Sequence, residues 1–152
     1  IIASLRDRSY CPKPAKRVYI AKKNSNKKRP LGIQSGNDKL VQEVVKMILE
    51  SIYEPVFSNK SHGFRPNRSC QTALMQIQKT FTGTNWFVEG DIHACFDSFD
   101  HHVIVEILKK RIDDEMFIQL IWKFLKAGYM EQWEYERTYS GVPQGSGVSP
   151  VL

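Results

Sequence analysis

The stretch WFVEGDIHACFDSFDHH, residues 86–102, decides the fold of this chain. It opens with an apolar run from Trp86 to Val88 that is rich in strand-forming residues, and this run leads to Asp91 just past Gly90. A carboxylate at the end of a buried strand is unfavourable unless a cation meets it there. The stretch therefore predicts a metal ion, or an Arg or Lys partner, at Asp91.

Phe96 follows Asp91 by five residues. In a continuous strand an odd offset places two side chains on opposite faces. The side chains of Asp91 and Phe96 can therefore line one pocket only if the strand ends near Ala94 and the chain curls. The polar residues that come next favour a turn and a helix cap, so we expect a strand, a tight curl and a helix from about His101. Considered alone, an Asp at this position is more commonly a cap or turn residue than a catalytic one, and the other motifs must decide.

Composition sets the class of protein. The 152 residues suffice for one domain with a core or for parts of two, and the net charge of +6 favours an anionic partner such as nucleic acid. Three widely spaced cysteines without a C-x-x-C pair indicate reduced thiols. No apolar run approaches the roughly 18 to 20 residues of a membrane span, so we expect a soluble, cytoplasmic protein with no membrane partner.

Positive charge is concentrated between Lys13 and Arg29, where eight residues are basic and none is acidic. Residues 18–21 and 29–33 read as two strands of a hairpin around a turn at 24–26. Such a surface can follow nucleic-acid phosphates, and the candidate contacts are Lys22, Lys23, Lys27 and Lys28. The alternative is a solvated hairpin whose lysines discourage edge pairing.

Helical periodicity recurs through the rest of the chain. We expect helices over 37–52, 69–81, 102–112 and 115–126, the first capped by Asn37 or Asp38 and the second by Ser69. The first helix should bury one stripe, made of Leu40, Val41, Val44, Val45, Ile48 and Ile52. The pair Asp113-Asp114 reads as a helix cap and not as a catalytic doublet.

Two loops carry further candidate residues. Residues 61–69 hold Arg65 and Arg68 directly before a helix, where they can bind a phosphate with the helix amides or, alternatively, pair with nearby carboxylates. A hairpin expected over 129–140 leads to residues 141–150, with three glycines and two prolines around Gln144. Such a backbone is shaped for close approach by another group.

Together these motifs resemble those of reverse transcriptases encoded by group II introns. Asp91-x-x-x-x-Phe96, followed by Asp97-x-x-Asp100-His101, is similar to the family's first palm motif. Residues 18–73 resemble its fingers region, and residues 139–152 resemble its Gly-x-Pro-Gln-Gly segment. Ser146 stands where group II members usually have a second Gly, which leaves the subclass open.

The resemblance implies an α+β right-hand polymerase fold, with fingers over residues 1–85 and part of the palm over 86–152. By it, Asp91 and the Ile92 carbonyl hold catalytic Mg²⁺, and Phe96 is the gate that rejects a ribose 2′-hydroxyl. Arg29 and Arg65 are the candidates for the triphosphate, and Gln144 for the sugar or base of the nucleotide. The family's Tyr-x-Asp-Asp motif does not occur in these residues, so we expect a fragment, truncated before the second metal-binding motif, that cannot polymerise alone.

The implied activity is RNA-directed DNA synthesis by a mobile element, with an RNA template, a DNA primer and deoxynucleotides as partners. Binding of the intron RNA as a maturase is implied as well, and the oligomeric state stays open between monomer and homodimer. One alternative is a non-catalytic RNA-binding maturase-type module. Another is a related polymerase, such as a retron, a non-long-terminal-repeat element or an RNA-templated RNA polymerase, and Phe96 argues against the last.

Overall fold

A computed structural model describes residues 1–21, 26, 28–142 and 145–152, and of residues 96 and 97 it describes the backbone alone. The chain is a mixed α+β protein, as predicted, in which the elements follow one another as α1 (Ile2–Arg6), β1 (Ala15–Ala21), β2 (Lys28–Ile33), α2 (Gly36–Tyr53), α3 (Cys70–Thr80), α4 (Cys95–Ser98), α5 (His101–Lys109), α6 (Glu115–Leu125), β3 (Tyr129–Glu131) and β4 (Glu134–Glu136). None of the helices in these described ranges is both long and apolar enough to cross a membrane.

A sheet with the strand order β2-β1-β3-β4 joins the two ends of the chain. The predicted basic hairpin is confirmed as the antiparallel pair of β1 and β2, in which Val18 lies opposite Leu31. The hairpin predicted over 129–140 is confirmed by β3 and β4, and β3 pairs in parallel with the start of β1. This pairing brings the segment that precedes the glycine-rich loop to the base of the basic hairpin.

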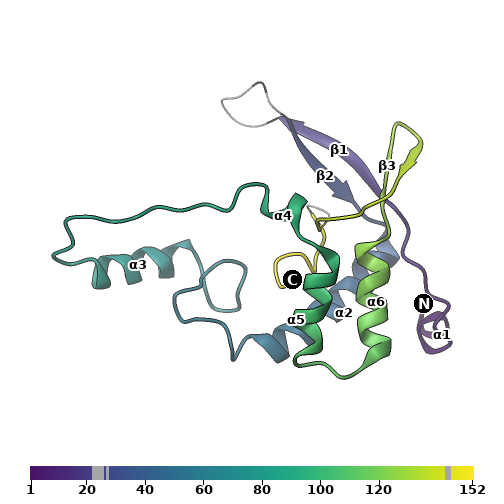
Figure 1. Cartoon of the computed structure of the whole chain (residues 1–152), viewed down its shortest axis with the longest axis horizontal. Coiled ribbons are helices and arrows are strands. Elements are labelled where there is room, and N and C mark those ends of the chain that lie inside the picture. The colour runs from purple at the N-terminus through teal and green to yellow at the C-terminus, as the bar shows by residue number, and fades with distance from the viewer. Residues whose placement is uncertain (22–25, 27, 143–144) are drawn as a thin grey trace.

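The hydrophobic core lies among α2, α5 and α6. Figure 1 shows α5 and α6 side by side with α2 running across them, and Leu49, Ile121 and Leu125 are almost fully buried there. The stripe predicted for the first helix is partly wrong: Val41, Val45 and Leu49 are buried, whereas Leu40, Val44 and Ile48 are exposed. The apolar stripe of α2 is wider than the surface that its neighbours cover, so only one edge of it is buried.

The cap predicted for this first helix is also wrong. Ser35 caps α2 and its hydroxyl accepts a hydrogen bond from the Asp38 amide. Asp38 is buried, and its carboxylate accepts hydrogen bonds from the Tyr10 hydroxyl at 2.6 Å and from the Lys13 amide at 3.2 Å. Burial and the neighbouring carboxylate raise the pKa of Tyr10 well above its ordinary value. Asp38 therefore fastens the N-terminal segment to the core.

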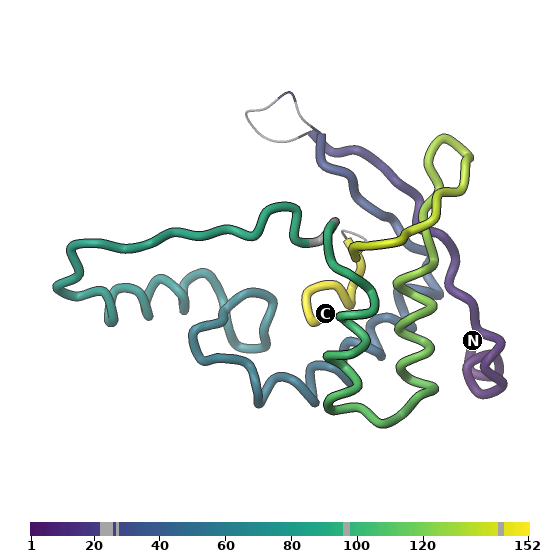
Figure 2. Tube along the Cα trace, viewed as in Figure 1, coloured from purple at the N-terminus to yellow at the C-terminus, as the bar shows by residue number. Residues whose placement is uncertain are grey.

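An arm made of residues 58–92 extends away from this core. It holds α3, which has no buried residue, and the extended segment that follows it, and both lie apart from the other helices in Figures 1 and 2. The strand predicted at 86–88 is not formed: Trp86, Phe87 and Val88 are 90%, 75% and 99% exposed. A strand persists only when a neighbour satisfies its backbone groups, and no described segment pairs with this one.

Candidate functional site

The glycine-rich loop of residues 139–150 is bound to the segment that precedes α5. The Gly141 amide donates a hydrogen bond to the Phe99 carbonyl at 2.7 Å, and Asp100 and Ser140 form an isolated antiparallel bridge. The His101 ring, only 2% exposed, donates through Nε2 to the Gly141 carbonyl at 2.7 Å. Two motifs that lie 40 residues apart in sequence are therefore adjacent in the fold.

The same loop packs against the basic hairpin. Gly145 has a φ of +96°, and a Cβ atom built on it would lie 2.8 Å from Leu31 Cδ1 and 3.2 Å from the Gly32 carbonyl oxygen. Both the backbone conformation and the close approach require glycine at this position. Leu31 and Gly32 of the sequence Arg-Pro-Leu-Gly-Ile at 29–33 thus lie directly beside the loop.

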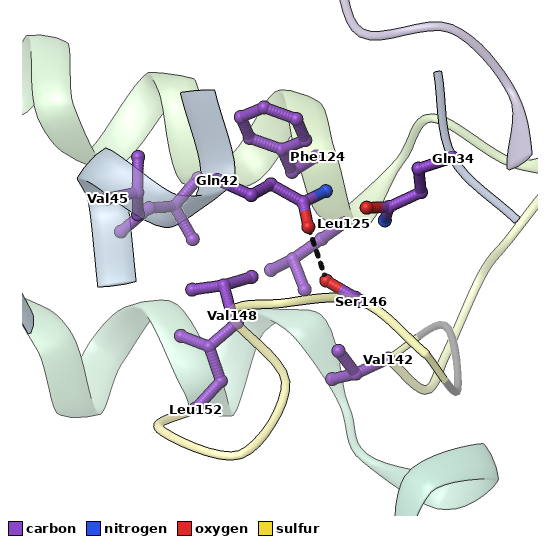
Figure 3. A pocket seen from close by; sticks show the side chains of 10 residues that line it. Gln34, Gln42, Val45, Phe124, Leu125, Val142, Ser146, Val148 and Leu152 are labelled. Atoms are coloured by element: carbon purple, nitrogen blue, oxygen red, sulfur yellow. Dashed lines mark hydrogen bonds between the residues drawn. The ribbon is translucent and has the colours of Figure 1, made fainter. Parts of the chain in front are cut away.

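A buried polar pair ties the loop to α2. The Ser146 hydroxyl donates a hydrogen bond to Gln42 Oε1 at 2.8 Å, and both residues are buried (Figure 3). Gln34 and apolar side chains such as Val142 and Val148 surround them, and the remaining space is about 10 Å³, no more than one water needs. This region is a packed support for the loop and not a ligand cavity.

Asp91 lies on the extended segment at the end of the arm. Its side chain is exposed, and within the part of the chain that is described it has no ion pair or hydrogen bond, so the predicted Arg or Lys partner is not found there. Ile92 is 71% exposed. The predicted curl is found at Ala94, whose backbone is left-handed with a φ of 49°. It leads into α4, which contains Phe96, a residue whose side chain lies outside the description.

Metal ligation can be judged from the donors that are present. No group of three or more His, Cys, Asp or Glu side chains gathers anywhere in residues 1–21, 26, 28–142 and 145–152, with the side chain of Asp97 left aside. A free carboxylate and a nearby backbone carbonyl are hard oxygen ligands of the kind that Mg²⁺ takes. Asp91 and Ile92 therefore fit part of such a site and do not complete one.

The structure describes only some of the other candidate residues on the hairpin and the loop. Arg29 and Lys28 lie exposed on β2, and neither has an ion pair among the residues that are described. The other candidates on the hairpin and the loop lie outside the described residues: Lys22, Lys23, Lys27 and Gln144.

Arg65 is held inside the chain. Its guanidinium binds the Glu54 carboxylate, with Nη2 to Oε1 at 2.8 Å, and Nη1 donates to the carbonyls of Ser58 and Ser61 at 2.7 and 2.9 Å. The hydrogen bond from Arg65 holds the pKa of Glu54 below its usual value. Arg68 donates to the Asn59 carbonyl at 3.2 Å. Arg65 thus pairs with a nearby carboxylate, as in the alternative prediction for this loop, whereas Arg68 bonds to Asn59 and to no carboxylate among the described residues.

Sequence reasoning missed Gln42 and Glu54, and it quoted His101 only as part of a motif. A Gln on an amphipathic helix and a Glu at the end of a helix can each indicate a polar partner, but the sequence does not identify that partner. The bonds from these residues span 104, 11 and 40 positions in the chain, respectively. Such contacts become visible only in the folded chain.

Comparisons with known proteins place these motifs in context. Residues 20–152 match the family described as reverse transcriptase (RNA-dependent DNA polymerase). The chain is 59% identical over all of its 152 residues to the group II intron-encoded protein LtrA of Lactococcus lactis subsp. cremoris, of which it covers 25%. It is 50% identical, again over its full length, to an uncharacterised 91 kDa protein in the cob intron of Schizosaccharomyces pombe, of which it covers 19%.

A plant relative is more distant. The chain is 42% identical over 89 residues, 59% of its length, to nuclear intron maturase 1 of Arabidopsis thaliana, a mitochondrial protein of which the match covers 12%. The chain thus spans a quarter or less of the length of these three curated relatives.

Proposed function

The chain belongs to the reverse transcriptase (RNA-dependent DNA polymerase) family, and from this premise we propose that it forms the fingers and the first part of the palm of a group II intron-encoded reverse transcriptase. The observation that carries the proposal is the convergence of three motifs on one loop. Gly141 is hydrogen-bonded to residues 99 and 101, Gly145 packs closely against residues 31 and 32, and Ser146 forms a buried hydrogen bond with Gln42. This assembly supports the wall of a nucleotide site.

The proposed reaction is nucleotidyl transfer on an RNA template, in which a primer 3′-hydroxyl attacks the α-phosphate of a deoxynucleotide. When bound, Mg²⁺ would supply charge stabilisation to the attacking and leaving oxygens. Asp91 and the Ile92 carbonyl would hold it, because they offer exposed oxygen ligands free of any described partner. Since one carboxylate makes a weak site, the activity requires further ligands beyond those described.

The roles of the other candidates follow from charge and shape. Arg29, exposed on β2, would bind the triphosphate, Gln144 would contact the nucleotide's sugar or base, and Phe96 would exclude ribonucleotides. For Arg65 we propose a structural role, because each of its nitrogen donors is already used within the chain. The lysines at 22, 23, 27 and 28, with Arg68, would contact RNA.

The proposed partners are an RNA template, a DNA primer, deoxynucleotides and the RNA of the host intron, and the proposed place of action is inside the cell. The similarity to nuclear intron maturase 1 favours a maturase role as well. RNA binding by the basic hairpin does not require the metal site. The two activities can therefore be separated by mutation.

Asp91→Asn in the full-length protein tests the proposal. Primer extension on an RNA template should fall by about 10²–10³-fold or more, because an amide holds a divalent cation far less well than a carboxylate. Binding of RNA should be unchanged, and Asp113→Asn, which alters another exposed acid, serves as the matched control. Undiminished synthesis by the Asp91 variant would overturn the catalytic assignment.

Two further measurements refine the assignment. Phe96→Ala should raise the incorporation of ribonucleotides, and unchanged sugar selectivity would remove Phe96 from the gate. These 152 residues alone should show no Mg²⁺-dependent extension of a primer, because the residues that the structure describes do not complete a metal site and the sequence has no Tyr-x-Asp-Asp motif.

A further inference from the structure

A groove of about 350 Å³ opens between the start of α5, the end of α6, and β4 with the segment that follows it. Its volume is that of a small-molecule site. The side chains that line it include His102, Trp122, Lys126, Tyr135, Arg137 and Tyr139. None of these residues has a role in the proposed polymerase site.

Aromatic rings dominate the groove. Tyr139 is 82% exposed and Tyr135 is 50% exposed, so both side chains are accessible to a ligand. Trp122 is held in place by two neighbours. The centroid of the His102 ring lies 4.8 Å from the centroid of the Trp122 ring, and the Lys126 ammonium lies 4.4 Å from the Trp122 centroid. Large rings left open to water beside a fixed indole form a stacking platform.

The charge of the groove is positive. Lys126 and Arg137 line it, no acidic residue does so among the described lining residues, and neither cation has a carboxylate partner in the described part of the chain. Thr138 also lines the groove, and its hydroxyl oxygen is buried, so the polar groups that the groove offers to a ligand are its two cations.

We propose that this groove binds an unpaired nucleotide of a single-stranded nucleic acid. The base stacks on Tyr135 and Tyr139, and the adjoining phosphate meets Lys126 or Arg137. Aromatic faces with interleaved cations are how proteins bind unpaired strands, whereas paired bases expose no face for stacking. The site goes beyond the proposed polymerase function and does not depend on Asp91.

The test is fluorescence anisotropy of a short labelled oligouridylate titrated with the 152-residue chain. Tyr139→Ala and Tyr135→Ala should each weaken binding by about 5- to 150-fold, because a stacked base is lost. Tyr139→Phe keeps the ring and should bind close to the parent chain. Arg137→Gln should reduce the salt dependence of log Kd by about 0.7, the loss of one phosphate contact on a single strand.

Matched controls keep the result interpretable. Trp133 lies on the same hairpin and is 95% exposed but does not line the groove, so Trp133→Ala should leave binding unchanged. Oligothymidylate in place of oligouridylate tells whether the groove prefers DNA or RNA, and either preference supports the site. If Tyr139→Ala binds like the parent chain, if Trp133→Ala weakens binding as much, or if duplex RNA competes as well as single strands, the proposal is wrong.

Discussion

The helical core and the arm of residues 58–92 come from one chain and differ in what they find to contact. In the core, apolar residues such as Leu49 and Leu125 are almost completely buried. In the arm, equally apolar residues such as Phe87 and Val88 are three-quarters or more exposed. Hydrophobic content alone therefore does not make a core, because each apolar segment also needs another segment to pack against.

The glycine-rich loop belongs to the first region and Asp91 to the second. The loop is bound on three sides within the described chain, through Phe99, Leu31 and Gln42. The carboxylate expected to bind metal sits on a segment without such contacts. One part of the candidate site is therefore already assembled, whereas the segment that carries Asp91 has no such support in the described chain.

The two regions should differ most in how much free energy of unfolding is lost when one apolar side chain is shortened in each. Leu49→Ala should lower the free energy of unfolding by about 2–5 kcal/mol, because it leaves a cavity in a fully buried site. Val88→Ala should change it by less than about 0.5 kcal/mol, because Val88 is 99% exposed. Urea unfolding measures both, and Leu40→Ala on the exposed edge of α2 is the control. Equal losses in the two regions would mean that the arm is packed.

Two histidines give the next comparison. His101→Ala should cost about 1–3 kcal/mol, because the buried Gly141 carbonyl would lose its hydrogen bond. His93→Ala in the exposed segment should be close to neutral. Thermal unfolding followed by circular dichroism separates the two outcomes. A neutral His101 variant would show that this bond does not hold the loop to α5.

A smaller effect is expected from the polar pair behind the loop. Ser146→Ala should destabilise the chain by about 1–2 kcal/mol, because Gln42 Oε1 stays buried without its donor. Adding Gln42→Leu should recover part of this loss, since both polar groups are then gone. A double-mutant cycle by urea unfolding gives the coupling energy. Strict additivity would contradict a direct interaction.

The smallest effect should be the pH dependence at the root of the arm. The pKa of Glu54 is lowered in the folded chain, so its contribution to stability is complete above the ordinary carboxyl pKa and is lost as the pH falls through the lowered value. Limited proteolysis of residues 58–69 should therefore speed up in acid. Glu54→Gln should remove this dependence and Glu106→Gln should not. A pH dependence that survives Glu54→Gln would assign it to another group.

The sequence predicted the local features of this fold well. The basic hairpin, the caps at Ser69 and Asp114 and the curl before α4 follow from neighbouring residues, and the structure confirms each of them. Of the pair Asp113-Asp114, Asp114 is the cap, since it accepts hydrogen bonds from two amides of α6.

The features that depend on distant partners were not predictable. Which edge of α2 is buried depends on α5 and α6, and the strand at 86–88 needs a neighbour that the described chain does not supply. Likewise, the commitment of Arg65 to Glu54 depends on how the loop of residues 58–69 folds back on the end of α2. Contacts between residues far apart in sequence decide these points.

Hydrogen exchange of the backbone amides in these 152 residues tests the central claim most directly, because it reports on both regions in one experiment. We expect protection for Gly141, whose amide donates to the Phe99 carbonyl, and exchange near the intrinsic rate for residues 86–92. Protection of residues 86–92 equal to that of Gly141 would contradict this expectation, because the segment that carries Asp91 would then be paired within this chain.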